Sequence, residues 1–275
     1  MNIETAEPRE RPPYWLVLGA LVLGFGVYAV LSTVVIAATG SSTAHPSPAA
    51  NNISNFIFDL SFVGAALYFT TVSRRIGRIE FGYRRISWRR GAAALIAAGA
   101  AYYALTLVYS AVFNLHATDK LPSGLGLHQT NWKIVVAVYV CVMAPMCEEF
   151  FFRGFLFGVL RRMRVTIAGR EAGPWIAAAI VGVLFGLAHF DSAQPEFLIP
   201  LGFLGFVLCI VRWRTGSLYP CMALHSLNNS VALAVNEHLG WGAGGVVAVI
   251  VGSLALIALV TGPLSANRSG AVAEA

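Results

Sequence analysis

Charged side chains are scarce in this sequence of 275 residues. Asp, Glu, Lys and Arg together make up 12% of it, about half of their usual share in a soluble domain, whereas 57% of the residues are hydrophobic. The mean hydropathy is +0.69. So few charges cannot cover the surface of a water-soluble chain of this length, and the composition therefore predicts a polytopic membrane protein.

Several functional patterns are missing as well. The sequence has no HExxH pair and no Gly-rich phosphate loop, which excludes the commonest zinc-protease helix and a P-loop nucleotide site. The four cysteines, at positions 141, 147, 209 and 221, lie within apolar runs without CxxC spacing, so we expect neither a disulfide framework nor a thiolate metal site. The net charge of +6 comes mostly from arginines in short connections, which is typical of membrane topology rather than of nucleic-acid binding.

Long apolar runs fill most of the chain. Those long enough to cross a bilayer, if tilt and short spans are allowed, fall at about 14–39, 53–73, 91–115, 134–160, 175–190, 197–211, 216–235 and 244–262. We therefore predict an all-α fold, a polytopic transmembrane helical bundle of about eight helices. Its expected parts are a polar N-terminal segment (1–13), N-terminal transmembrane helices (14–130), a catalytic transmembrane core (131–262) and a disordered tail (263–275).

Arginines mark every second connection between these runs. They crowd the segments 74–90 and 161–174, and Arg212 and Arg214 mark the next such connection, whereas the intervening connections hold no arginine. Because short cytoplasmic loops are rich in Lys and Arg, this alternation predicts that both termini and the Arg-rich connections are cytoplasmic. It also supports an even number of helices.

Three charged residues interrupt the fourth apolar run: Glu148, Glu149 and Arg153. A charge near the bilayer centre costs roughly 2.5–3.5 kcal/mol on insertion scales. Each of these three side chains must therefore be paired, face a water-filled cavity or have a function. Glu149 and Arg153 share a helix face, which predicts a salt bridge and makes Glu148 our candidate catalytic base. A buried ion cluster that only fixes helix packing is the alternative. Pro145 removes a helical hydrogen bond one turn earlier and can free the carbonyl of Cys141.

Other polar residues lie in later runs at a similar depth. His189 closes the fifth run, and His225 and Asn229 are one turn apart in the seventh. Counted from the cytoplasmic helix ends, these residues and Glu148 lie roughly 17–22 Å deep, so one plane could hold all four. Glu148 could take a proton from water that one His holds, while the other His and the Asn amide stabilise an oxyanion. Alternatively, Glu148, His189 and His225 could bind a zinc ion whose water is the nucleophile.

Two further features concern the packing of the helices. Gly154 and Gly158 form a GxxxG pattern in the fourth run, and Gly182 and Gly186 form another in the fifth, so we expect these two helices to approach closely. Asp59 in the second run is another intramembrane acid, which we expect to be a hydrogen-bonded structural residue.

The three polar motifs, in their order on successive membrane helices, resemble a known family. They are Glu-Glu-x-x-x-Arg (Glu148, Glu149, Arg153), Phe-x-x-x-His (Phe185, His189) and His-x-x-x-Asn (His225, Asn229). They are similar to the signature of the CPBP family, the CAAX-processing and bacteriocin-processing intramembrane endopeptidases, which are related to the type II CAAX prenyl endopeptidases. The resemblance covers about 134–230.

This resemblance implies roles for the motif residues. Glu148 and His189 would together activate water. The oxyanion would be stabilised by His225 and Asn229. The site would be supported by Glu149, Arg153 and Phe185. The family is commonly called a metalloprotease family, so zinc held by Glu148, His189 and His225 is an optional cofactor. An eight-helix fold is implied as well.

We therefore expect a hydrolase, an integral membrane endopeptidase that cleaves peptide bonds in or next to the membrane. Its expected partners are a peptide or membrane-protein substrate and the lipid bilayer, without nucleic acid. The preference for Arg over Lys and the abundance of Ala and Gly favour a high-GC bacterial genome, hence a bacterial plasma membrane. The rival interpretations are a non-proteolytic binding, immunity or scaffold protein that uses the same pocket, and a proton-coupled transporter, which should show a repeat that we do not find.

Overall fold

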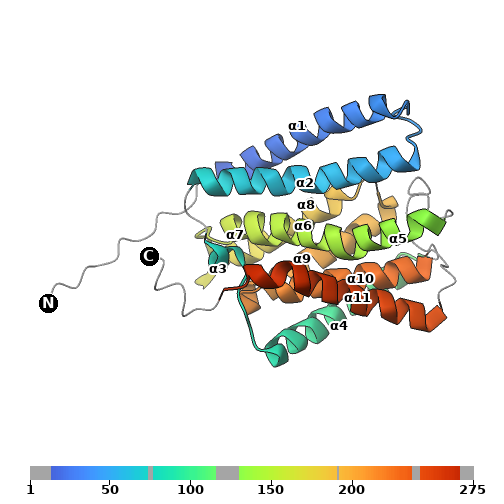
Figure 1. Ribbon diagram of the computed structural model, residues 1–275. Coiled ribbons are helices and arrows are strands. Elements are labelled where there is room, and N and C mark those ends of the chain that lie inside the picture. Colours follow the sequence, from blue (N-terminus) through green and yellow to red (C-terminus); the bar gives the residue numbers. More distant parts are fainter. Residues whose placement is uncertain (1–13, 74–76, 116–129, 191, 237–241, 267–275) are drawn as a thin grey trace.

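The computed structural model describes residues 14–73, 77–115, 130–190, 192–236 and 242–266, and this part of the chain is almost entirely helical (Figure 1). The predicted all-α fold is confirmed. The longer helices are α1 (Trp15–Ala38), α2 (Pro48–Ser73), α4 (Trp88–Val112), α8 (Gly173–Ala188), α9 (Leu198–Thr215), α10 (Tyr219–Asn236) and α11 (Gly242–Thr261). Short elements are α3 (Arg78–Phe81), the hairpin of β1 (Thr166–Ile167) and β2 (Arg170–Glu171), and the 3-10 turns η4 (Pro195–Phe197) and η5 (Gly262–Leu264).

One continuous helix, which we call the signature helix, carries the Glu-Glu-x-x-x-Arg motif. It consists of α5 (Thr130–Val138), the π-helix η2 (Tyr139–Met143), α6 (Ala144–Glu148), the π-helix η3 (Glu149–Leu156) and α7 (Phe157–Leu160). A π-helical turn holds one residue more than an α-helical one, and such turns are frequent at functional sites. The motif therefore begins at the last residue of α6 and continues within the π-helix η3.

Each of the predicted apolar runs is helical in the described part of the chain. Six of these helices are long and apolar enough to cross a membrane: Trp15–Ala38, Pro48–Val72, Trp88–Val112, Trp132–Leu160, Pro195–Thr215 and Gly242–Leu264. The apolar helix α8 is shorter, with 16 residues, and α10 is interrupted by polar side chains such as His225 and Asn229. The protein is thus a multi-pass membrane protein.

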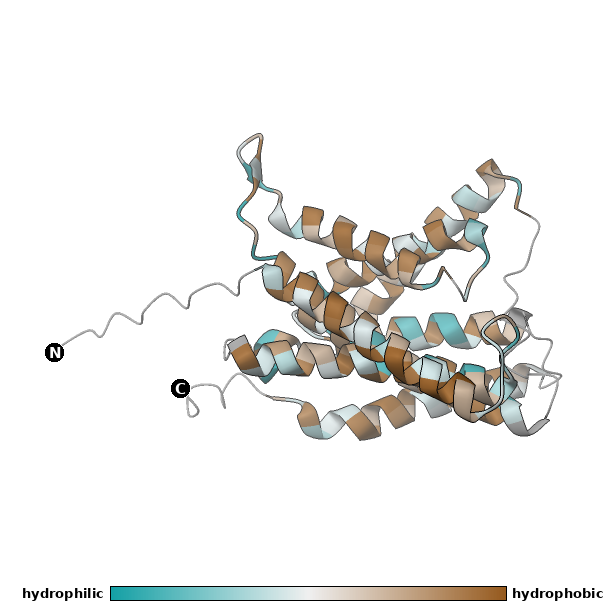
Figure 2. Ribbon diagram, turned by 90° about the horizontal axis from the view of Figure 1, so that it is seen from above, coloured by the Kyte–Doolittle hydropathy of each residue, from teal (hydrophilic) through white to brown (hydrophobic). Residues whose placement is uncertain are grey.

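The helices form a bundle with the signature helix inside it (Figure 1). The α1 helix packs along α2, α2 packs against the signature helix, and α8 packs along α9. On the other side, α10 contacts α4, α11 and the signature helix. Large apolar side chains cover the outside, for example Leu107, Ile134 and Leu259, and brown segments run along most helices in Figure 2. This outer surface is suited to lipid.

The glycine motifs pack differently from our expectation. A Cβ atom at Gly186 would lie 2.6 Å from the carbonyl oxygen of Leu198, so α8 presents Gly182 and Gly186 to the backbone of α9. Gly154 instead lies against the ring of Phe81. The two helices do pack against each other, as expected, where α7 and η3 contact α8. The glycines are not the contact surface between them, because a GxxxG pattern allows close packing without specifying the partner helix.

The Arg-rich connections meet at one end of the bundle. The Arg212 guanidinium donates to the carbonyl oxygen of Glu80 (2.7 Å), Arg162 lies 3.8 Å from the Glu80 carboxylate, and Arg85 donates to Ser265 Oγ (2.8 Å). That the Arg-rich connections lie at the same end of the bundle agrees with the predicted alternation. The cytoplasmic location of this end stays a prediction. The Ser265 contact also shows that residues 263–266 are folded, contrary to the expected tail. The segments 1–13 and 267–275 lie outside the described residues.

Candidate active site

The signature helix is opened just before Glu148. Pro145 has no N–H group and cannot donate to the carbonyl of Cys141, which instead accepts a hydrogen bond from Ser226 Oγ on α10 (2.6 Å). The preceding carbonyl, that of Val140, accepts from Asn229 Nδ2 on the same helix (2.9 Å). Side chains of α10 therefore satisfy the backbone groups that the interruption leaves free.

The predicted salt bridge between Glu149 and Arg153 is present. Their closest atoms are 2.8 Å apart, and both side chains are fully buried. The guanidinium also lies over the ring of Phe185, with its carbon 4.3 Å from the ring centroid, and donates to the carbonyl oxygen of Gly205 (3.3 Å). Removing one charge of such a buried pair would leave the other uncompensated, so the pair fixes this part of the helix.

His189 follows directly after α8 and is held in one tautomer. Its Nδ1 lies 2.8 Å from the carbonyl oxygen of Phe185. A carbonyl only accepts, so Nδ1 carries the proton, and Nε2 of the neutral ring carries the lone pair. This Nε2 lies 3.8 Å from Oε2 of Glu148.

His225 is bound to the second glutamate of the motif, a contact that sequence analysis missed. Its Nδ1 lies 2.8 Å from Glu149 Oε1, the oxygen that also accepts from Arg153. Because the paired carboxylate accepts, Nδ1 donates, and Nε2 of the neutral ring again carries the lone pair. That nitrogen lies 3.8 Å from Glu148 Oε2.

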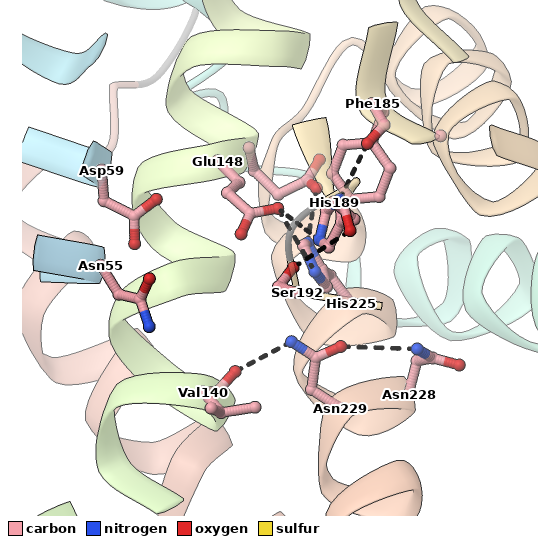
Figure 3. A network of polar contacts seen from close by, with 12 residues as sticks. Asn55, Asp59, Val140, Glu148, Phe185, His189, Ser192, His225, Asn228 and Asn229 are labelled. Carbon is pink, nitrogen blue, oxygen red and sulfur yellow. Dashed lines mark hydrogen bonds and ion pairs between the residues drawn. The ribbon is translucent and has the colours of Figure 1, made fainter. Parts of the chain in front are cut away.

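One carboxylate oxygen, Oε2 of Glu148, thus faces both imidazole rings. Glu148 Oε2 is buried and makes no hydrogen bond within the described residues. A separation of 3.8 Å is too long for a direct hydrogen bond but suits a bridging water, which could donate to the carboxylate and to an imidazole lone pair. The arrangement is seen in Figure 3. Glu148 and His189 retain 14% and 22% side-chain exposure, whereas His225 retains 2%.

Part of the chain is similar to a known protein family. Residues 130–231 match the family described as "Type II CAAX prenyl endopeptidase Rce1-like". The match begins with α5 and ends within α10, so it includes every residue of the three motifs. Residues 130–231 form an Rce1-like domain.

A curated relative extends the likeness beyond this domain but has no assigned function. The "Uncharacterized protein YyaK" of Bacillus subtilis (strain 168) is 28% identical over 153 residues, which are 53% of this chain and 47% of that protein. The chain therefore spans about half the length of the curated relative it matches. No solved structure matches the chain.

The described residues show no preformed cluster of metal ligands. Glu and His are ordinary zinc ligands, yet the described residues contain no group of three or more His, Cys, Asp or Glu side chains placed to hold a metal ion. One oxygen of Glu148 faces both rings from 3.8 Å. The optional zinc ion stays a prediction.

Asn229 lies one helical turn from His225 but has a different neighbourhood. Its Nδ2 donates to the carbonyl of Val140, and its Oδ1 lies 3.4 Å from Nδ2 of Asn228 (Figure 3). None of the contacts among the described residues joins it to Glu148, and its place in an oxyanion site stays a prediction.

The structure also places an acid from outside the Rce1-like domain beside the site. Asp59 on α2 is buried and accepts a hydrogen bond from the Tyr139 hydroxyl (2.8 Å), as expected of a hydrogen-bonded residue. Figure 3 shows it on the opposite side of Glu148 from the two imidazoles. Its burial in an apolar helix was readable from the sequence, whereas nothing in the sequence pointed to Tyr139.

Proposed function

We propose that the protein is an integral membrane endopeptidase in which Glu148 activates a water molecule. The observation that carries this proposal is the buried, unbonded Glu148 Oε2 that faces the Nε2 atoms of His189 and His225. The Rce1-like domain supports the same class of reaction.

The reaction would begin with a water held between Glu148 and His189. Glu148 takes one proton while the water oxygen attacks the carbonyl carbon of a peptide bond, which gives a tetrahedral intermediate with a negatively charged oxygen. Glu148 then returns the proton to the amide nitrogen, the carbon–nitrogen bond breaks, and the products are a carboxylic acid and an amine. The bond with Phe185 keeps the lone pair of His189 directed at the water.

His225 and Asn229 are the proposed stabilisers of the oxyanion. Because Nδ1 of His225 donates to Glu149, its Nε2 can donate to an oxyanion only in the doubly protonated form of the ring. Asn229 has a second amide hydrogen beyond the one that it gives to Val140. Preorganised donors of this kind contribute through the charge that develops in the transition state.

The proposed substrates are peptides, signal remnants or membrane proteins that reach the plane of the site within a bacterial plasma membrane. Only a cell that makes prenyl tails could supply a prenylated substrate, so the family description does not by itself assign one to this chain.

The test is cleavage of a quenched peptide pool by purified protein beside Glu148→Gln, with Glu171→Gln as a matched control on the exposed hairpin. We expect Glu148→Gln to lose about 10²–10⁴-fold in kcat and Glu171→Gln to keep wild-type activity. Cleavage that is equal in wild type and Glu148→Gln would refute the proposal.

The same assay decides between a carboxylate-activated and a metal-bound water. Activity that persists in a chelator supports the mechanism written here. Loss of activity in the chelator, with recovery on adding zinc, would instead support a metal held by Glu148, His189 and His225.

A further inference from the structure

Asp59 is an ionisable residue beside the site that the proposed mechanism does not use. Its side chain is 4% exposed in a membrane-spanning helix, and within the described residues it has no Lys or Arg partner. Ionisable residues inside a membrane are costly and are usually retained for a function. Its bonding partner is the hydroxyl of Tyr139, which also lies 3.0 Å from the carbonyl oxygen of Asn55 on the same helix.

Tyr139 is the first residue of the π-helix η2. The α10 helix holds the next two residues of this turn from the other side, through the bonds from Asn229 to Val140 and from Ser226 to Cys141. Three side-chain hydrogen bonds from two different helices therefore hold one irregular turn. Pro145 makes the support necessary, because the regular backbone bond to Cys141 cannot form.

The turn sets the direction in which Glu148 points. A π-helical turn inserts one residue, so a relaxation of η2 to an α-helix would rotate every later side chain by about 100°. Such a rotation would move Glu148 away from His189 and His225. Asp59 is also close enough to Glu148 to interact with it electrostatically, and Figure 3 shows the two carboxyl groups on facing helices.

We infer that Asp59 is a positioning residue for the proposed reaction: by holding Tyr139 it fixes the turn that directs Glu148 at the two imidazoles. This inference rests on the proposed function. It assigns a part in the site to the N-terminal half of the chain, which lies outside the Rce1-like domain. Because Tyr139 and Asp59 are the two partners of one hydrogen bond, loss of either side chain should have the same consequence.

The test compares kcat and KM of Tyr139→Phe, Asp59→Leu and their double variant on the quenched peptide pool. We expect kcat to fall about tenfold to hundredfold in each single variant with little change in KM, because a misdirected base slows the chemical step. The double variant should be no slower than Asp59→Leu, since both changes remove one contact. Asp59→Asn keeps an acceptor and should retain most of the activity.

Ser61→Ala is the matched control, because Ser61 is buried on the same helix and its hydroxyl has no hydrogen-bond partner within the described residues. A fall in kcat that is as large in Ser61→Ala as in Tyr139→Phe would show a general effect of α2 and overturn the inference. So would an unchanged kcat in both Tyr139→Phe and Asp59→Leu.

Amide hydrogen exchange across residues 139–148 gives a readout that does not need activity. Tyr139→Phe should speed exchange there if the hydroxyl holds the turn, and unchanged exchange would overturn the inference. A wild-type protein that cleaves no peptide would refute the proposed function, and the exchange measurement alone would then report whether Asp59 holds the turn.

Discussion

Glu148 and Glu149 are neighbours in the sequence, yet they belong to two adjoining parts of the signature helix with opposite character. Each part contains a π-helix, and we call them the buried half and the bulged half. The buried half, Glu149–Leu160, places its charges in an ion pair and its phenylalanines in the core. The bulged half, Tyr139–Glu148, is interrupted by Pro145 and relies on side chains of α2 and α10. Glu148 stays partly exposed with an unbonded oxygen. One half thus provides rigidity, and the other provides a reactive group.

The largest expected effect comes from breaking the buried half. Arg153→Met would remove the cation that pairs with the Glu149 carboxylate, which also binds His225. Removal of one partner of a buried ion pair typically costs about 3–5 kcal/mol. We expect a strongly lowered Tm in detergent. The double variant Glu149→Gln/Arg153→Met should recover part of the loss, and a single variant as stable as wild type would contradict the role given to the pair.

A smaller effect is expected where Gly154 of the buried half lies against Phe81. A Cβ atom there would press into the ring, and overpacking of this kind costs about 1–3 kcal/mol. Thermal unfolding of Gly154→Ala should show the loss. Gly158→Ala is the control, because no side chain or backbone of another described segment lies within 4 Å of a Cβ at that position, and its Tm should stay unchanged or rise. Equal effects of the two substitutions would argue against the close contact.

The smallest stability change is expected in the bulged half. Ser226→Ala removes the hydrogen bond to the Cys141 carbonyl and should cost about 1 kcal/mol. Its activity should fall further than its Tm suggests, because the turn before Glu148 loses a support. Thr261→Val removes a similar hydroxyl-to-carbonyl bond within α11, which among the described residues makes no hydrogen bond to the signature helix through this hydroxyl, and should leave kcat unchanged. Parallel losses of kcat in both variants would contradict the special role of the bulge.

The same contrast separates what the sequence predicts from what it leaves out. Apolar length predicts the helices, and the spacing of Glu149 and Arg153 predicts their salt bridge, because both depend on neighbours along one chain segment. Pro145 likewise predicts a freed Cys141 carbonyl. The donor to that carbonyl, Ser226, lies on another helix, and no local rule names it.

Contacts between distant segments account for the remaining misses. The bond between His225 and Glu149 joins residues 76 positions apart, and it changes the role of the second glutamate from an ion-pair partner alone to a support of an imidazole. That the glycines of α8 face α9 could not be predicted for the same reason. Counting residues along each helix did predict that Glu148, His189 and His225 lie at one depth, because the rise per residue of a helix is nearly constant.

The most direct test of the account is to measure kcat and Tm on the same preparations of Glu148→Gln and Glu149→Gln. The account predicts that Glu148→Gln keeps the wild-type Tm while kcat falls about 10²–10⁴-fold, and that Glu149→Gln lowers Tm because Arg153 loses its partner. Wild-type kcat in Glu148→Gln would contradict the claim that this carboxylate is the reactive group of the site.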